Sequence, residues 1–167
     1  YKPGLESIIL IGLLFLAVYF YYPALYSSFL FDDFYNLAGL SEIKQSGFLY
    51  YIFGGFSGPS GRPVSLLSFA LQYQSWPYNP FAFKTVNLLI HLLNGVLIWF
   101  ISKHLIKYFE TNENHQNLFA ILITAIWLFH PMHLTTVLYV VQRMTQLSCL
   151  FSLVGILAYL NIRHDIY

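Results

Sequence analysis

Long apolar runs alternate with short polar segments along the chain, and this pattern predicts membrane-spanning helices. Three runs, at positions 8–31, 85–102 and 144–162, contain no Lys, Arg, Asp or Glu. Each reaches the roughly 18 residues at which an apolar run indicates a transmembrane helix. With a fourth, shorter run before His130-Pro131, the sequence predicts helices at about 5–23, 81–109, 117–131 and 136–163.

The segment 27–80 breaks this pattern, because it carries charged residues and a glycine-rich stretch at 54–61. Short apolar pieces predict short helices at 33–44, 48–53 and 62–76, the last with Pro63 in its first turn. Their many aromatic residues indicate that these pieces lie on the membrane surface. Ordered loops of this length usually have a function.

Composition supports a membrane protein. The 167 residues are 57% hydrophobic and 9% charged, with a net charge of +1, whereas soluble domains are about 25% charged. These values exclude a disordered chain and argue against nucleic-acid binding, which needs a basic surface. We therefore expect an all-α integral membrane fold, with about four transmembrane helices and short interfacial helices in the first outer loop, 27–80.

Lysine and arginine near the helix ends predict the orientation of the chain. Lys2, Lys103, Lys107 and Arg163 fall on one side if there are four spans, and the positive-inside rule makes that side cytoplasmic. The outer loop and the corner at 130–143 then share the opposite face.

The adjacent pair Asp32-Asp33 is the sharpest chemical feature. It follows the first helix and is flanked by apolar residues, which raise the cost of a buried carboxylate. Such a pair suits a general base or oxygen ligands for a divalent cation such as Mg or Mn. The alternative is that one of the two acids caps a short helix that begins at Phe34.

Two arginines are candidates for binding phosphate, which matches the planar guanidinium. Arg62 follows the glycine-rich stretch and alternatively contacts lipid headgroups. Arg143 lies inside an apolar stretch, where an ionisable side chain indicates function and needs a partner. We expect that partner to be Asp32, Asp33 or an anionic ligand.

A second polar cluster, formed by His130, His133, Gln142 and Arg143, lies at the outer end of the last two helices. The two histidines can line the site or bind a metal, but hydrogen bonds at a helix junction are commoner. In the second helix, His91 and Asn94 are expected to form interhelical hydrogen bonds, and Gly95 to allow close helix packing.

Together these motifs resemble the GT-C class of polytopic glycosyltransferases. The chain is most similar to the transmembrane O-mannosyltransferase family with C-terminal tetratricopeptide repeats, and to its bacterial relatives. The resemblance covers roughly 28–160 and rests on the order of five motifs and of Val137 and Arg143: 31–33 (FDD), 62–69 (RPVSLLSF), 79–81 (NPF), 86–94 (VNLLIHLLN) and 128–133 (LFHPMH).

The resemblance implies that residues 1–167 form the N-terminal part of an enzyme that moves a sugar from a polyprenyl-phosphate carrier to an acceptor hydroxyl outside the cytoplasm. It implies a protein acceptor and contact with membrane lipid. Asp32 or Asp33 would activate the acceptor or position a metal, Arg62 and Arg143 would bind the donor phosphate, and His130, His133 and Gln142 would line the site. A non-catalytic membrane subunit with the same fold is the alternative.

The sequence also departs from the family pattern. Thr135 and Thr145 stand where the mannosyltransferases have Glu and Asp, and Gln142 stands where Gly is usual. The form Gln142-Arg143-Met144 is more similar to the bacterial branch. We therefore expect a bacterial inner membrane rather than the endoplasmic reticulum.

Overall fold

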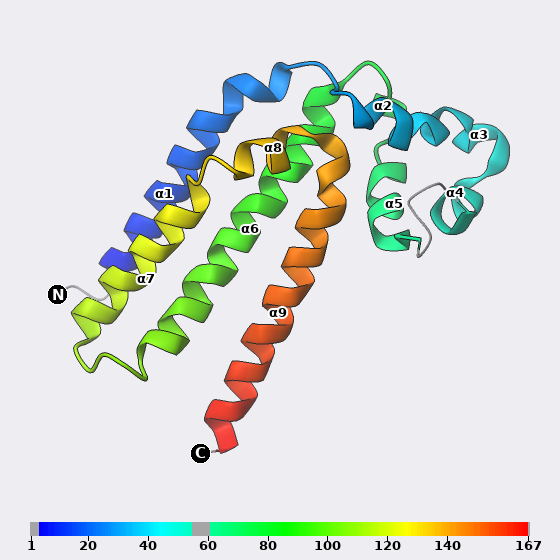
Figure 1. The fold of residues 1–167 in the computed structure, drawn as a ribbon. Coiled ribbons are helices and arrows are strands. Elements are labelled where there is room, and N and C mark those ends of the chain that lie inside the picture. The colour runs from blue at the N-terminus through cyan, green and yellow to red at the C-terminus, as the bar shows by residue number, and fades with distance from the viewer. Residues whose placement is uncertain (1–3, 55–60, 167) are drawn as a thin grey trace.

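The computed structural model describes residues 4–54 and 61–166, and every regular element in that part of the chain is helical (Figure 1). Lys2 and most of the glycine-rich stretch lie outside the described residues. The long helices are α1 (Leu5–Tyr21), α6 (Pro80–Ile106), α7 (Glu113–Leu128) and α9 (Arg143–Ile166). The outer loop contains α2 (Asp32–Leu37), α3 (Ile43–Ser46), α4 (Phe48–Gly54) and α5 (Pro63–Ala70), and α8 (His133–Leu138) joins α7 to α9. Short 3-10 turns η1 (Tyr22–Tyr26), η2 (Ala38–Glu42), η3 (Tyr73–Ser75) and η4 (Val140–Gln142) link them.

The four long helices form a row in which α7 packs between α1 and α6, and α6 packs between α7 and α9. Along the helix axes, the bundle has two ends. Figure 1 shows both chain ends and the α6–α7 turn at one of them, which we call the terminal end. The outer-loop helices and α8 lie at the other end, the loop end. The four long helices thus run between the same two ends, as expected, while the side of the membrane that each end faces stays a prediction.

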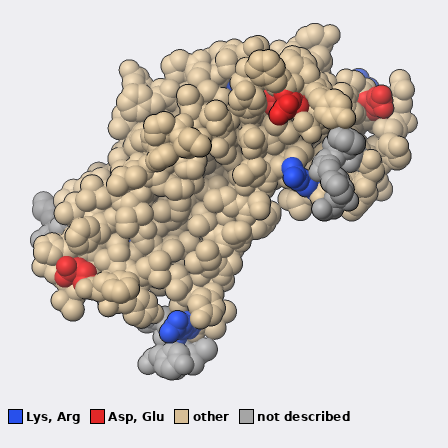
Figure 2. Space-filling model, viewed as in Figure 1, with Lys and Arg blue, Asp and Glu red and all other residues tan. Residues whose placement is uncertain are grey.

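Three segments in the described part of the chain are long and apolar enough to span a membrane: Leu5–Tyr26, Pro80–Ile106 and Val140–Arg163. Four spans were expected. The difference is α7, whose 16 residues give about 24 Å of helix, short of the roughly 30 Å of a bilayer core. Figure 2 shows a nearly uncharged surface along the bundle, with charged side chains toward its two ends. The all-α membrane fold is thus confirmed.

The outer loop is packed onto the bundle by a hydrophobic core of its own. Phe29 and Leu37 from the loop, Phe69 from α5, Phe83 from α6 and Met144 from α9 are all buried in one cluster. Pro63 stands at the start of α5, as its rigid φ favours. Of the predicted short helices, 48–53 is present as α4, whereas 33–44 is divided into α2, η2 and α3, and 62–76 ends at Ala70 and is followed by η3. The loop is a packed unit rather than a simple connection.

The last helix begins later than the sequence predicts. A helix from 136 to 163 was expected, but the chain is extended at Tyr139, with φ −80° and ψ 118°, between α8 and η4. The continuous helix α9 starts only at Arg143. Side chains from α2 and α6 bind the backbone groups that this break exposes, as described next.

Candidate functional site

The two adjacent aspartates of α2 have different surroundings. Asp32 is exposed, whereas the side chain of Asp33 is completely buried. Asp33 Oδ2 accepts a hydrogen bond of 3.0 Å from Leu30 N, and Oδ1 accepts one of 2.9 Å from Val141 N. Phe31, not an aspartate, occupies the N-cap position of α2, so the capping alternative is wrong for both acids. Asp33 joins the outer loop to η4, just before α9, and Asp32 lies at the surface of the protein.

Asn87 of α6 binds the backbone carbonyls at the helix break. Its Nδ2 donates to the carbonyl of Tyr139 at 2.9 Å and to that of Val137 at 3.2 Å. An unpaired backbone group inside protein or lipid is costly. Asn87 therefore supplies a donor to the carbonyls at the break, while Asp33 supplies an acceptor to the N–H group of Val141.

Arg143 is also completely buried, and its guanidinium bonds to three residues in two other helices, α5 and α6. Nε donates to Asn87 Oδ1 at 2.8 Å, Nη1 to the Ser68 carbonyl at 3.0 Å, and Nη2 to the Phe83 carbonyl at 2.8 Å. The expected aspartate partner is wrong, since no carboxylate lies within 4.0 Å of Arg143 among the described residues. In this geometry Arg143 fastens α5, α6 and α9 together and is not presented to a phosphate.

Lys84 is a third buried charge, and sequence reasoning assigned it no role. Its Nζ donates to Ser27 Oγ at 2.6 Å and to the carbonyls of Ser27 and Ser28 at 2.9 and 2.8 Å. All three ammonium donors are therefore used to fix the chain just before Phe29. The available signal was its position on the predicted outer side, where the positive-inside rule disfavours lysine.

Arg62 is exposed and lies at the edge of a largely apolar cavity. A cavity of about 270 Å³ lies between the start of α5 and α9, and its lining includes Arg62, Val64, Leu147 and Phe151. Arg62 Nη1 donates to the sulfur of Met144 at 3.0 Å, a weak bond that a stronger acceptor can replace. The cavity therefore combines an apolar wall with one available cation.

The histidines lie elsewhere on the loop end, in the corner between α7 and α8. His133 packs against Trp127 and His91, with ring centroids 4.4 and 5.2 Å apart. Burial, and the nearby His130, lower the pKa of His133 below its ordinary value. Among the described residues, neither His130 nor His133 forms a hydrogen bond or ring contact with Asp32 or Arg62.

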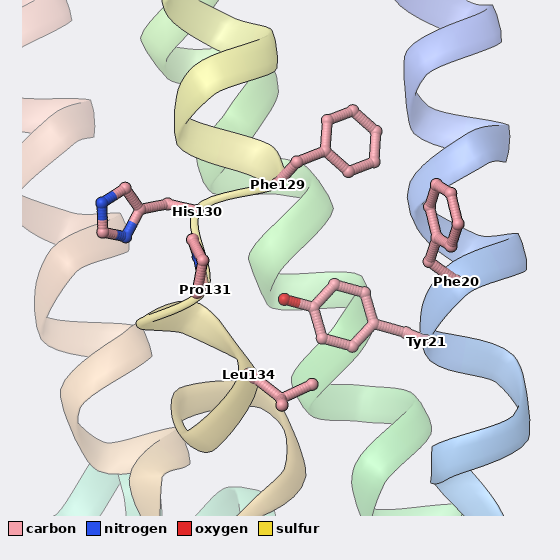
Figure 3. A pocket seen from close by; sticks show the side chains of 6 residues that line it. All are labelled: Phe20, Tyr21, Phe129, His130, Pro131 and Leu134. Carbon is pink, nitrogen blue, oxygen red and sulfur yellow. The ribbon is translucent and has the colours of Figure 1, made fainter.

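An apolar pocket of about 340 Å³ lies beside the same corner, against α1. Figure 3 shows Phe20, Tyr21, Phe129 and Leu134 around it, while the ring of His130 points away from the two α1 side chains. His130 therefore contributes to a different pocket from the one at Arg62. Gln142 is exposed and accepts a hydrogen bond of 2.9 Å from Thr145 Oγ1.

The predicted interhelical contacts of α6 are confirmed. His91 Nε2 lies 3.1 Å from the Leu128 carbonyl, and Asn94 Nδ2 donates to the Gln146 carbonyl at 3.3 Å. A Cβ atom at Gly95 would lie 2.6 Å from Leu128 Cδ2, which is too close. The absent side chain at Gly95 thus allows α6 and α7 to approach.

The acidic pair does not present two carboxylates to a cation. Both oxygens of Asp33 already accept backbone N–H groups, so Asp32 alone is available. Within residues 4–54 and 61–166, no three His, Cys, Asp or Glu side chains come together as a metal site. The geometry therefore does not favour the predicted Mg or Mn site at this pair.

Comparison with known proteins supports the resemblance to O-mannosyltransferases. The chain is 27% identical over 149 residues to protein O-mannosyl-transferase TMTC3 of Homo sapiens, covering 83% of this chain and 15% of that protein. It is 33% identical over 104 residues to protein O-mannosyl-transferase TMTC1 of Mus musculus, covering 62% of this chain and 10% of that protein. No family model and no solved structure matches.

These similarities are distant, and the chain spans only a small part of each relative. The sugar-transfer activity that the names of these relatives state is therefore taken up for this chain only as a proposal. Both relatives are mammalian proteins, which argues against our expectation of a bacterial inner membrane. The three apolar helices support an integral membrane location.

Proposed function

We propose that this chain is part of a GT-C-type membrane glycosyltransferase that moves a sugar from a polyprenyl-phosphate-linked donor to an acceptor hydroxyl on a protein, at the extracytoplasmic face. One observation carries the proposal: the exposed Asp32 and the exposed Arg62 belong to parts of the outer loop that are bonded to the same short segment, 141–144. Asp33, next to Asp32, bonds to Val141 N, and Arg62 bonds to Met144 three residues further on.

Asp32 has the properties of a general base in this reaction. It is exposed, and the adjacent bonds of Asp33 fix the turn that carries it. Asp32 would take the proton of the acceptor hydroxyl, whose oxygen then attacks the anomeric carbon of the donor sugar. The carbon–oxygen bond to phosphate breaks, and the lipid-linked phosphate leaves with that electron pair.

Arg62 has the position expected of a phosphate ligand. A leaving phosphate needs cationic stabilisation, and Arg62 opens onto the apolar cavity along α9. A polyprenyl chain fits an apolar wall, and its phosphate fits a guanidinium at the edge of that wall. Arg143 then acts indirectly, because it holds α5, which follows Arg62, against α9.

The alternative is a non-catalytic subunit that retains the fold. It is favoured by the number of polar residues used for packing: Asp33, Lys84 and Arg143 all bond inside the protein. Thr135 and Thr145 also stand where the resembled enzymes have acids. Under this alternative Asp32 is an ordinary surface carboxylate.

The deciding experiment is sugar transfer by membranes that carry the full-length protein, supplied with polyprenyl-phosphate-linked hexoses. We expect Asp32→Asn to lower the rate about 100-fold or more, the effect typical of losing a general base, without loss of thermal stability. Glu113→Gln, an exposed acid in α7, is the matched control.

Each outcome of this experiment has a distinct meaning. Normal transfer by Asp32→Asn would reject Asp32 as the base. A parent protein that transfers no sugar from any tested donor would favour the non-catalytic subunit. Transfer that needs added Mg or Mn would restore a metal role for Asp32.

A further inference from the structure

A second, more enclosed cavity lies in the outer loop, where α2 contributes residues one helical turn after Asp32. It has a volume of about 170 Å³ and is formed by α2, η2, α3 and α4. The polar and aromatic residues that line it are Tyr35, Asn36, Glu42, Ser46, Tyr50 and Tyr51. The proposed reaction gives none of these side chains a role.

The lining combines aromatic rings with groups that bind hydroxyls. Asn36 Nδ2 donates to the Asp32 carbonyl at 2.8 Å, which leaves Oδ1 as an acceptor. Glu42 is exposed, and its carboxylate has no hydrogen-bond partner among the described residues. A compound with hydroxyl groups on one side and C–H groups on the other satisfies both kinds of surface, and a hexose is such a compound.

Charge in the cavity favours a neutral ligand. No lysine or arginine lines it within the described part of the chain, and Glu42 makes it acidic. A phosphate or other anion would be repelled there, and phosphate has its own candidate at Arg62. The chemistry of the two cavities therefore assigns the hexosyl group to this cavity and the phosphate bonded to it to Arg62.

The helix geometry places this cavity next to the proposed base. Tyr35 and Asn36 follow Asp32 by three and four positions in α2, so they share one face of the helix. Side chains at this spacing are neighbours, with Cβ atoms about 5–6 Å apart. A hexose in the cavity would thus lie within one helical turn of the Asp32 carboxylate.

We propose that the cavity between α2 and α4 binds the hexosyl group of the donor, with Glu42 and Asn36 binding its hydroxyls and Tyr50 packing against its ring. This inference rests on the proposed glycosyl transfer for its meaning. Binding of a free hexoside can nevertheless be measured without any transfer, and so tests the cavity separately.

The experiment is saturation-transfer difference NMR on the full-length protein in lipid nanodiscs, with the methyl glycosides of mannose, glucose and galactose as probes. We expect at least one hexoside to bind. Glu42→Gln and Tyr50→Leu should each weaken that binding about tenfold, as expected for the loss of a hydrogen bond to a charged group or of a ring contact. Both residues are exposed, so both variants should fold.

Glu113→Gln, at the terminal end, is the matched control and should bind like the parent. The proposal is overturned if no hexoside binds, or if Glu42→Gln and Tyr50→Leu both bind it as the parent does. Transfer activity without hexoside binding would reject the cavity and keep the proposed function. Hexoside binding that depends on Glu42, in a protein without transfer activity, would keep the cavity and reject the transferase.

Discussion

The two ends of the helix bundle differ in the burial and the partners of the charged residues that hold their helices together. At the terminal end, Glu6 and Lys103 form an ion pair of 2.7 Å whose side chains remain 17% and 24% exposed, and Glu110 pairs with His115 in an exposed turn. At the loop end, Asp33, Lys84 and Arg143 are completely buried, and neutral groups are their hydrogen-bond partners.

The difference shows where the molecule needs a fixed shape. Burying a charge is expensive unless several hydrogen bonds satisfy it, and each of the three buried charges has at least two. At the terminal end, apolar packing around Trp99 holds the helices, and the ion-paired side chains keep contact with water. The loop end uses buried charges to position a loop, and the exposed Asp32 and Arg62 lie on that loop.

The largest effect is expected from Arg143→Ala. The change removes hydrogen bonds to Asn87, Ser68 and Phe83 and the contact with the Phe69 ring, 4.6 Å from the guanidinium carbon. We expect a loss of about 3–5 kcal/mol, as for large-to-small changes in a core, or failure to fold. The measurement is thermal unfolding of the purified protein in detergent.

Arg163→Ala is the control, because Arg163 is an exposed arginine of the same helix near the terminal end. It should change the stability by no more than about 0.5 kcal/mol. If the two variants are equally stable, Arg143 has no special structural role. The contrast between the two ends of the bundle would then be wrong.

The next effect separates the two adjacent aspartates. Asp33→Asn replaces one of two acceptor oxygens by an amide, which cannot accept from both Leu30 N and Val141 N. We expect a loss of about 1–3 kcal/mol, the cost of an unsatisfied buried group, while Asp32→Asn should leave stability unchanged. Thermal unfolding of both variants checks this, and the reverse order would exchange the roles of the two acids.

The sequence predicted the elements that depend on local pattern. The apolar runs predicted the first helix and α6, Pro63 marked the start of α5, and the absence of a side chain at Gly95 indicated close packing. These features follow from length, periodicity or the properties of a single residue, and neighbours in the sequence are enough to reveal them.

The helix break, and the burial of Asp33 next to the exposed Asp32, could not be predicted in this way. The break at Tyr139 depends on Asn87, 52 positions away, and on Asp33, which is 108 positions from Val141. Two adjacent acids look equivalent in a sequence, and only the position of the α8–α9 connection makes Asp33 the buried one. The burial of Lys84 likewise depends on where the chain at Ser27 returns to α6.

A smaller effect concerns acidity at the α7–α8 corner. Burial lowers the pKa of His133 in the folded protein, so the unfolded chain binds a proton more readily. This contribution to stability is present above the ordinary histidine pKa of about 6.5 and is lost as the pH falls below it. We expect the unfolding temperature of the parent protein to fall as the pH is lowered from 7.5 to 5.5. The unfolding temperature of His133→Gln should fall less over the same range. An equal fall in both proteins would show that other groups cause it, and His104→Gln serves as the control.

The smallest effect is expected from Glu6→Gln at the terminal end. The change removes the ion pair with Lys103, but both side chains keep contact with water and Lys103 also lies over the Trp99 ring, 4.9 Å from its centroid. Partly exposed ion pairs contribute about 0–1 kcal/mol, so the unfolding temperature should change little. The part of its salt dependence that comes from this ion pair should be absent in the variant. A loss as large as that of Asp33→Asn would mean that the terminal end also depends on its charges, and the two ends would then differ in exposure but not in what holds them.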